Sequence, residues 1–192
     1  LPNMTLMAPR DEAMLVHMLH TAVSLDGPAA IRYPRGAGVG VEIPEVPRLL
    51  RVGKGEVLRE GERVAILGYG TGVGKALGAA DILAEGGLDV TVADARFAKP
   101  LDTGLLAQLA AEHDLLVTVE EGVLPGGFGS GVWESLSEGG LAPRVLRVGL
   151  PDRYVTHGAP KLLHEEVGFT AERIAERIEA AVMNPHGSLA SA

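Results

Sequence analysis

The sequence predicts an α/β fold in which a mostly parallel sheet is covered by helices. Short apolar segments that are typical of strands alternate with segments of helical period, and this alternation predicts parallel strands with helices on both faces. With 192 residues, 46% of them hydrophobic, the chain is long enough for one sizeable core, or for one domain and part of another.

Composition excludes several classes of protein. The net charge of -8, from 17 basic and 25 acidic residues, disfavours nucleic acid as a partner. The sequence has no apolar run of about 18 residues and no N-terminal signal pattern, so we expect a soluble, cytoplasmic protein that does not insert into membranes. The sequence contains no cysteine, which excludes disulfides and metal sites with thiolate ligands.

The first part of the chain resembles the end of an α/β unit. Residues 5–7 are predicted to be the end of a strand, and residues 11–23 a helix with Asp11 and Glu12 at its positive end. Residues 29–33 form a short apolar strand that Pro34 should stop. Because a domain seldom begins with a severed strand, we expect the chain to be the C-terminal portion of a longer polypeptide.

The second part alternates strands and helices. Between the two parts lies a stretch with two prolines and no helical period, in which we place a linker at 43–52. The strands predicted after it are, in order, 53–58 at an edge, 64–68, 88–95, 115–119 and 143–150. The predicted helices are 71–87, 101–113, one that starts at 129–136, 159–166 and 170–183. The polar tail, 184–192, is expected to be disordered.

Two arginines in the segment AIRYPRG are the main candidates for an anion site. Arg32 lies on the predicted strand, whereas Arg35 projects just past its carboxyl end, where ligands collect in parallel sheets. A guanidinium can bind a phosphate or a carboxylate through two parallel hydrogen bonds. The alternative for both arginines is a salt bridge between domains.

Two glycine-rich segments each allow two interpretations. GYGTGVG, at 68–74, lies between a strand and a helix, but its spacing fits neither a dinucleotide fingerprint nor a P-loop, which favours a tight turn over nucleotide binding. In TVEEGVLPGGFGSG, Glu120 and Glu121 should point to opposite faces of a strand, so they cannot form an acid/base pair. Either one glutamate meets a partner surface while the glycine loop allows close backbone approach, or the segment is a solvated strand end and a flexible turn.

The six histidines do not form a recognisable metal-ligand pattern. His157 follows Asp152 and Arg153 in a predicted loop after a strand, where a stapling hydrogen bond is at least as plausible as catalysis. The sequence therefore suggests no catalytic, cofactor-binding or metal-binding residue in this chain.

The segments MAPRDEAMLVHMLHTA, GPAAIRYPRGAGVGV, DARFAKPLD, LLVTVEEG and VGLPDRYVTHG closely resemble the C-terminal part of 1-deoxy-D-xylulose-5-phosphate synthases. These are thiamine-diphosphate enzymes of the transketolase superfamily, and the resemblance extends to about residue 180. It implies that residues 1–42 end a pyrimidine-binding domain and that residues 53–183 form a C-terminal transketolase-type domain. A 2-oxoacid dehydrogenase β subunit, another transketolase-like enzyme and a non-catalytic assembly module remain alternatives.

The resemblance also implies a reaction. Such enzymes condense pyruvate with glyceraldehyde 3-phosphate, using thiamine diphosphate and Mg²⁺, in isoprenoid precursor, thiamine and pyridoxal biosynthesis. Arg35 matches the arginine that contacts the phosphate of the aldehyde, and the role of Arg32 is less certain. Because the GDG…N and ADGxTH motifs are absent from the sequence, we expect the cofactor to bind mainly outside this chain. The expected partners are the N-terminal part of the same enzyme and a second copy in a homodimer.

Overall fold

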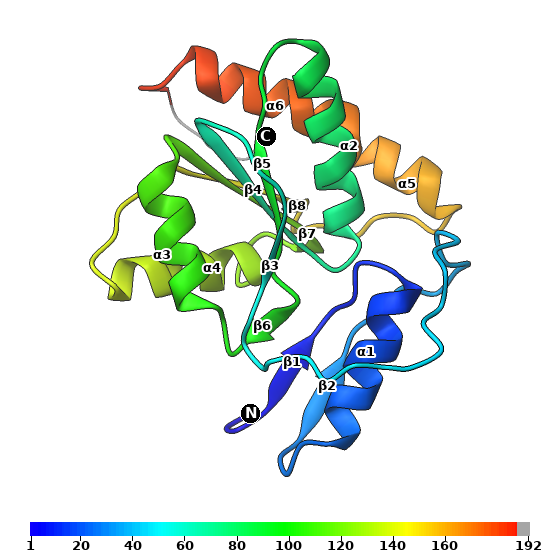
Figure 1. Cartoon of the computed structure of the whole chain (residues 1–192). Coiled ribbons are helices and arrows are strands. Elements are labelled where there is room, and N and C mark those ends of the chain that lie inside the picture. Colours follow the sequence, from blue (N-terminus) through cyan, green and yellow to red (C-terminus); the bar gives the residue numbers. More distant parts are fainter. Residues whose placement is uncertain (188–192) are drawn as a thin grey trace.

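The computed structural model describes residues 1–187 and contains a five-stranded sheet flanked by helices (Figure 1). The strand order is β3-β5-β4-β7-β8, with the last four strands mutually parallel and β3 antiparallel at one edge. Its strands are β3 (Glu56–Arg59), β4 (Val64–Tyr69), β5 (Thr91–Asp94), β7 (Leu115–Val123) and β8 (Val145–Leu150). The predicted α/β class, with a mostly parallel sheet covered by helices, is confirmed.

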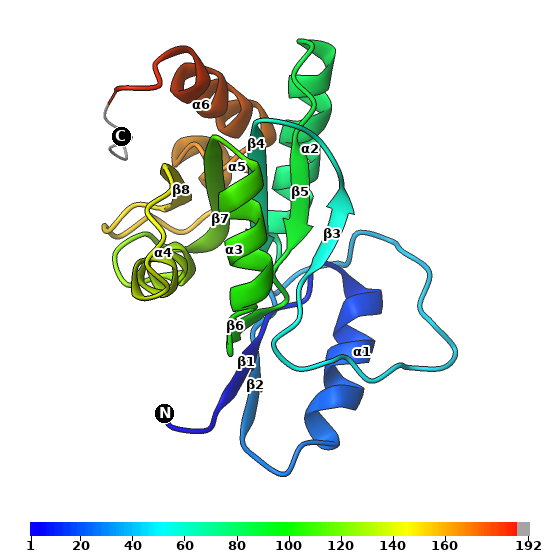
Figure 2. The same ribbon diagram turned by 60° about the vertical axis from the view of Figure 1, so that its left-hand side comes forward.

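Helices cover both faces of this sheet because its strands are apolar on both sides. On one face lie α2 (Gly72–Glu85) and α6 (Ala171–Met183), and on the other α3 (Thr103–Glu112) and α4 (Phe128–Glu138) (Figures 1 and 2). Successive residues of β4 serve opposite cores: Val64 and Ile66 pack on the α2 side, whereas Ala65 and Leu67 pack on the α3 side. The short helix α5 (Pro160–Glu166) precedes α6.

A second, three-stranded sheet joins the two parts of the chain. Its order is β2-β1-β6, in which β1 (Thr5–Met7) pairs in parallel with β2 (Ala29–Ile31) and antiparallel with β6 (Phe97–Lys99). Figure 2 shows this sheet and α1 (Glu12–Val23) below the larger sheet. A small core seals the junction, formed by Met7, Met14, Met18, Leu50 and Phe97.

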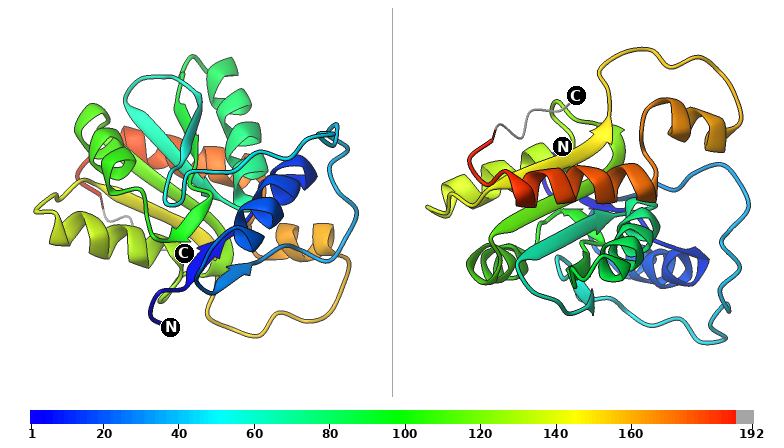
Figure 3. Two further views of the ribbon diagram at one scale, coloured as in Figure 1. Left: turned by 60° about the horizontal axis from the view of Figure 1, so that its bottom comes forward. Right: turned by 90° about the horizontal axis from the view of Figure 1, so that it is seen from above.

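The connection from β2 to β3 has no helix or strand of its own and runs around the outer side of α1 (Figures 2 and 3). The predicted linker lies inside this connection, but the proposed domain boundaries stay a prediction. Of the predicted tail, residues 184–187 follow α6, and residues 188–192 lie outside the described part.

Among the differences from the predicted elements, two change where a strand ends and one adds a strand. Strand β2 ends at Ile31, two residues before the predicted end, although the Arg32 N–H still donates to the Met7 carbonyl over 2.9 Å. Strand β7 continues to Val123 instead of ending at residue 119. Strand β6 was not predicted, because its three residues gain their partner from β1, which lies some ninety residues earlier in the chain.

Candidate functional site

The segment that follows β2 carries both candidate arginines, and the structure separates them. The guanidinium of Arg32 forms an ion pair with Glu121 of β7, with 3.2 Å between Nη1 and Oε2. This contact agrees with the salt-bridge alternative for Arg32. Arg35 is exposed and forms no hydrogen bond or ion pair with any other described residue. Its guanidinium therefore remains available for an anion from outside this chain.

Glu121 links three parts of the molecule. Its carboxylate accepts a hydrogen bond from the Thr71 hydroxyl over 2.6 Å, contacts His164 Nε2 over 3.1 Å and pairs with Arg32. These partners come from the start of α2, from α5 and from the end of β2. Burial alone would raise the pKa of Glu121, but the hydrogen bonds from Thr71 and His164 and the charge of Arg32 outweigh it and lower the pKa.

Glu120, its neighbour, has a different environment. The side chain is 4% exposed, and its carboxylate accepts the backbone N–H groups of Phe128 and Gly129, each over 2.7 Å. These are free donors at the N-terminus of α4, so Glu120 caps this helix from a neighbouring strand. Burial is the main influence on its pKa and raises it, against the opposing effect of the two hydrogen bonds.

The glycine loop before α4 fits around this carboxylate. A Cβ atom at Gly127 would lie 2.5 Å from Oε2 of Glu120, so only glycine allows the backbone to approach so closely. The sequence-based interpretation of a loop that permits close backbone approach thus holds, but the approaching group is a glutamate of the same chain. The alternative of a solvated strand end is wrong for Glu120.

The two glutamates line one pocket at the carboxyl end of β4 and β7. The pocket has a volume of about 270 Å³ and is also lined by Arg32 and by the stacked rings of Tyr69 and Phe128, whose centroids are 4.7 Å apart. Their carboxylates nonetheless point to opposite faces of β7, as expected: Glu120 toward the N-terminus of α4, and Glu121 toward Thr71 and His164. Since both carboxylates are occupied by partners within the chain, the structure does not suggest an acid/base pair.

The GYGTG segment is a tight turn between β4 and α2. Gly70 has a φ of +58°, and a Cβ atom at Gly72 would lie 2.9 Å from the carbonyl carbon of Val119. Glycine is required here for backbone conformation and for packing of α2 against β7. The prediction of a turn at this position is confirmed.

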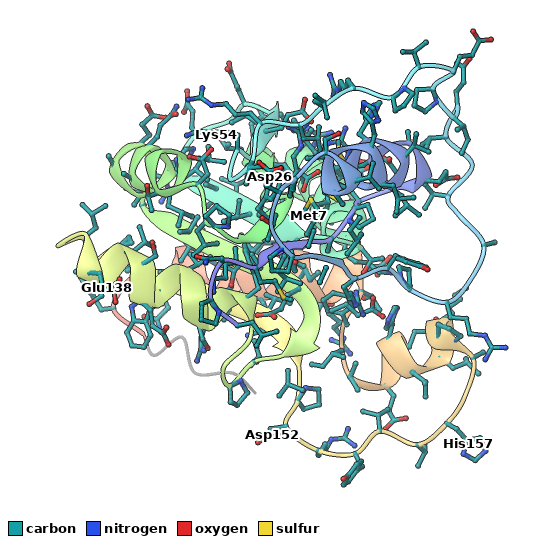
Figure 4. All side chains as sticks on the ribbon, turned by 90° about the horizontal axis from the view of Figure 1, so that it is seen from below. Met7, Asp26, Lys54, Glu138, Asp152 and His157 are labelled. Atoms are coloured by element: carbon teal, nitrogen blue, oxygen red, sulfur yellow. The ribbon has the colours of Figure 1, made fainter. Side chains whose placement is uncertain are left out.

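The histidines do not gather. His113 contacts the Leu109 carbonyl and the Thr91 hydroxyl, and His17 accepts the N–H of Arg48. Asp152 and His157 lie on the wide loop between β8 and α5, away from both sheets (Figure 4), and His157 is exposed. Among residues 1–187, no group of three or more His, Asp or Glu side chains is arranged to hold a metal ion.

Sequence reasoning missed the second role of Glu12. Besides lying at the positive end of α1, Glu12 accepts the backbone N–H groups of Val39 and Gly40 with its carboxylate, over 3.1 and 2.6 Å. The glycines on either side of Val39 were the only hint in the sequence, because glycine allows the backbone to turn toward a carboxylate. The contact could not be predicted, since Glu12 and Gly40 are almost thirty residues apart in the sequence.

Within the described residues, every helix is too short or too polar to cross a membrane.

Comparisons with known proteins agree with this fold. Residues 53–174 match the family described as "Transketolase, C-terminal domain". The chain is 52% identical to a 1-deoxy-D-xylulose-5-phosphate synthase of Thermomicrobium roseum, over 98% of this chain and 30% of the relative. It is also 52% identical to a probable chloroplastic 1-deoxy-D-xylulose-5-phosphate synthase 2 of Oryza sativa subsp. japonica, over 96% of this chain and 27% of the relative. The chain thus spans less than a third of the length of these curated relatives.

Solved transketolase structures have a similar fold. A structure described as "Split gene transketolase, inactive beta4 tetramer" superposes with a TM-score of 0.86 at 35% identity, over 95% of this chain and 59% of that one. A transketolase from Campylobacter jejuni superposes with a TM-score of 0.61 at 17% identity, over 93% of this chain and 26% of that one, and shares the fold alone.

Proposed function

The chain belongs to the transketolase C-terminal domain family, and from this premise we propose that it is the C-terminal part of a 1-deoxy-D-xylulose-5-phosphate synthase. The observation that carries the proposal is 52% identity to a synthase of that name over 98% of the chain. The complete enzyme would condense pyruvate with glyceraldehyde 3-phosphate, in isoprenoid precursor, thiamine and pyridoxal biosynthesis. It would act in the cytoplasm as a homodimer.

The role that we propose for this chain's residues is to bind the acceptor phosphate. Arg35 lies beyond the carboxyl end of β2, and none of the other described residues engages its guanidinium. Two parallel N–H···O hydrogen bonds to a phosphate would fix the aldehyde at its far end. By holding the phosphate, Arg35 would help to orient the reacting carbonyl of the aldehyde, although it does not contact that carbonyl itself. Arg32 is already paired with Glu121, which supports a structural role for it.

Thiamine diphosphate and Mg²⁺ would bind mainly in parts of the enzyme outside this chain. The described residues do not fit a Mg²⁺ site, because their His, Asp and Glu side chains do not gather in groups of three or more suited to a metal. We therefore assign no cofactor-dependent step to the residues of this chain.

The proposal predicts a selective loss of acceptor affinity when Arg35 is removed. In the full-length synthase, Arg35→Ala should raise the KM for glyceraldehyde 3-phosphate at least ~10-fold, a loss of about 1.4 kcal/mol, while the KM for pyruvate changes little. Steady-state kinetics with each substrate varied in turn measures both values. Arg51→Ala is the matched control, since Arg51 is also exposed in the β2–β3 connection. An unchanged KM for the aldehyde would refute the role of Arg35.

A second candidate function is assembly without catalysis. The solved structure that superposes with a TM-score of 0.86 is described as an inactive β4 tetramer of a split gene transketolase. This chain covers 59% of that one, which supports a role as the association module of its enzyme. A 2-oxoacid dehydrogenase β subunit is a third class, and it would be indifferent to glyceraldehyde 3-phosphate.

A further inference from the structure

The segment that carries Arg35 is exposed along its whole length. Residues 32–43 are all exposed, and they belong to no helix or strand. A chain segment of this kind normally samples many conformations. A ligand that binds only one of them is bound more weakly, because ordering the segment costs free energy. An arginine that binds a phosphate by two parallel hydrogen bonds requires a defined position. The segment of residues 32–40, called here the Arg35 loop, must therefore be held in place by contacts with the rest of the chain.

The first end of the Arg35 loop is held by Glu121. The Arg32 N–H continues the β1–β2 pairing through its 2.9 Å hydrogen bond to the Met7 carbonyl, and the Arg32 guanidinium contacts Glu121 over 3.2 Å. Glu121 is itself fixed by Thr71 and His164. The side chain of Arg32 is thus attached to the large sheet, three residues before Arg35.

The second end is held by Glu12, in the first turn of α1. The two oxygens of its carboxylate each accept one N–H, Oε1 from Gly40 over 2.6 Å and Oε2 from Val39 over 3.1 Å. Successive N–H groups that converge in this way form a small anion-binding concavity. Gly40 has a φ of +91°, which glycine adopts without strain and other residues rarely adopt.

Gly38 shows how closely the loop lies against this carboxylate. A Cβ atom at Gly38 would lie 2.5 Å from Cδ of Glu12, so any larger residue would push the carboxylate away from the loop. The hydrogen bonds from its own N–H and from Gly40 also lower the pKa of Glu12, so the carboxylate stays charged near neutral pH. Glu12 and Gly38 therefore form one contact that can be broken from either side.

We propose that Glu12 is a positioning residue, which holds the second end of the Arg35 loop while the Arg32–Glu121 pair holds the first, and so places Arg35 for the phosphate of the acceptor. This inference rests on the proposed function of Arg35. The two carboxylates do not touch the substrate; they act by reducing the conformations open to the loop before the phosphate arrives. The structure thus assigns a purpose to the ion pair of Arg32, whose guanidinium anchors the loop instead of binding the ligand.

The test uses the full-length synthase with four single variants. Glu12→Gln removes the charge of the anchor, and Gly38→Ala displaces the anchor but leaves Glu12 and Arg35 intact. Arg35→Ala removes the phosphate ligand. Glu42→Gln is the matched control, since Glu42 lies in the same connection and forms no hydrogen bond or ion pair with any residue of 1–187.

We expect Glu12→Gln and Gly38→Ala each to raise the KM for glyceraldehyde 3-phosphate roughly 3- to 10-fold, the range expected for the loss of one or two hydrogen bonds. The kcat and the KM for pyruvate should stay within about 2-fold of wild type. With unphosphorylated D-glyceraldehyde as acceptor, neither variant should differ from wild type. Combining Glu12→Gln with Arg35→Ala should add less than about 2-fold to the effect of Arg35→Ala alone, because both changes act on one contact.

The outcomes separate this inference from the proposed function. If Arg35→Ala raises the KM for glyceraldehyde 3-phosphate but Glu12→Gln and Gly38→Ala do not, the positioning role is refuted and the proposed function stands. If Arg35→Ala leaves the KM for glyceraldehyde 3-phosphate unchanged, the proposed function is refuted, and the positioning role is refuted as well because it depends on that function. Equal losses with the phosphorylated and the unphosphorylated acceptor would mean that Glu12 serves only the general fold, which also overturns the proposal.

Discussion

At the scale of single residues, charges decide how the two parts of this chain are joined. Arg10, from the loop before α1, donates to Glu56 over 2.7 Å and to Asp94 over 3.0 Å. Glu56 also pairs with Arg96. Asp94 is fully buried, and burial raises its pKa although the N–H of Arg96 and the charge of Arg10 oppose this. The group is a partly buried connection between the loop before α1 and the large sheet, and it depends on Arg10.

Removing Arg10 should destabilise the chain by about 3 kcal/mol at pH 7, because Asp94 would be left charged, buried and poorly compensated. The raised pKa fixes the sign of the pH effect. The folded state takes up the proton of Asp94 at a higher pH than the unfolded state, so the deficit of Arg10→Ala should shrink as the pH falls toward the unfolded value of 3.8. Urea unfolding at several pH values measures this.

Two further variants make this test specific. Asp94→Asn in the Arg10→Ala background should recover part of the lost stability at pH 7, because it removes the uncompensated charge. Arg173→Ala is the control, since the Arg173–Glu176 pair is exposed and should contribute less than about 1 kcal/mol. A deficit that does not change with pH would contradict the role of the Asp94 charge.

At the scale of elements, the turn between β4 and α2 depends on one close approach. Gly72 and Gly74 are both in the first turn of α2, but only Gly72 faces the backbone of β7. A Cβ atom at Gly74 would meet no atom within 4 Å. The two glycines therefore offer a matched comparison within one helix.

Gly72→Ala should cost about 2 kcal/mol or more, because the added methyl group would press α2 away from β7. Gly74→Ala should be neutral or stabilise the chain by up to about 1 kcal/mol, because alanine is the better helix former and the space is open. Thermal unfolding of the two variants beside the wild type gives both values. Similar effects of the two changes would show that packing against β7 does not explain the glycine.

An element or contact could be predicted from the sequence when its interacting residues are close together in the chain, and not when they are far apart. Helix α6 followed from the period of Ile174, Ile178 and Ala181, which are all buried as expected. Strand β6 and the capping of α4 by Glu120 could not be predicted, because each depends on a partner from another element. The early end of β2 has the same origin, since its length is set by the three residues of β1 that pair with it. Arg35 can be singled out from the sequence, and its role stays a prediction, whereas the contacts of its loop with Glu12 and Glu121 are long-range.

At the scale of the whole molecule, the chain contains a five-stranded sheet and a smaller, three-stranded one. The small sheet has two parallel strands, β1 and β2, from the first part of the chain, and its third strand, β6, comes from the second part. The chain also spans less than a third of the length of its curated relatives. These observations support the proposal that the chain acts together with a further part of the enzyme.

The 192-residue chain alone should therefore lack synthase activity and should associate with itself or with the remaining part of the enzyme. Sedimentation equilibrium gives its state of association, and an assay of 1-deoxy-D-xylulose 5-phosphate formation gives its activity. Activity should appear when the N-terminal part is supplied. A strictly monomeric chain would contradict the assembly role, and activity of the isolated chain would contradict the assignment as a part.

We propose that Arg35 binds the phosphate of the acceptor in a 1-deoxy-D-xylulose-5-phosphate synthase. The most direct measurement is the ratio of kcat/KM for glyceraldehyde 3-phosphate to kcat/KM for unphosphorylated D-glyceraldehyde, in the full-length enzyme and in its Arg35→Ala variant. The ratio isolates the contribution of the phosphate, because both acceptors carry the same reacting aldehyde. We predict that the substitution lowers the ratio at least ~10-fold. An unchanged ratio would contradict the claim.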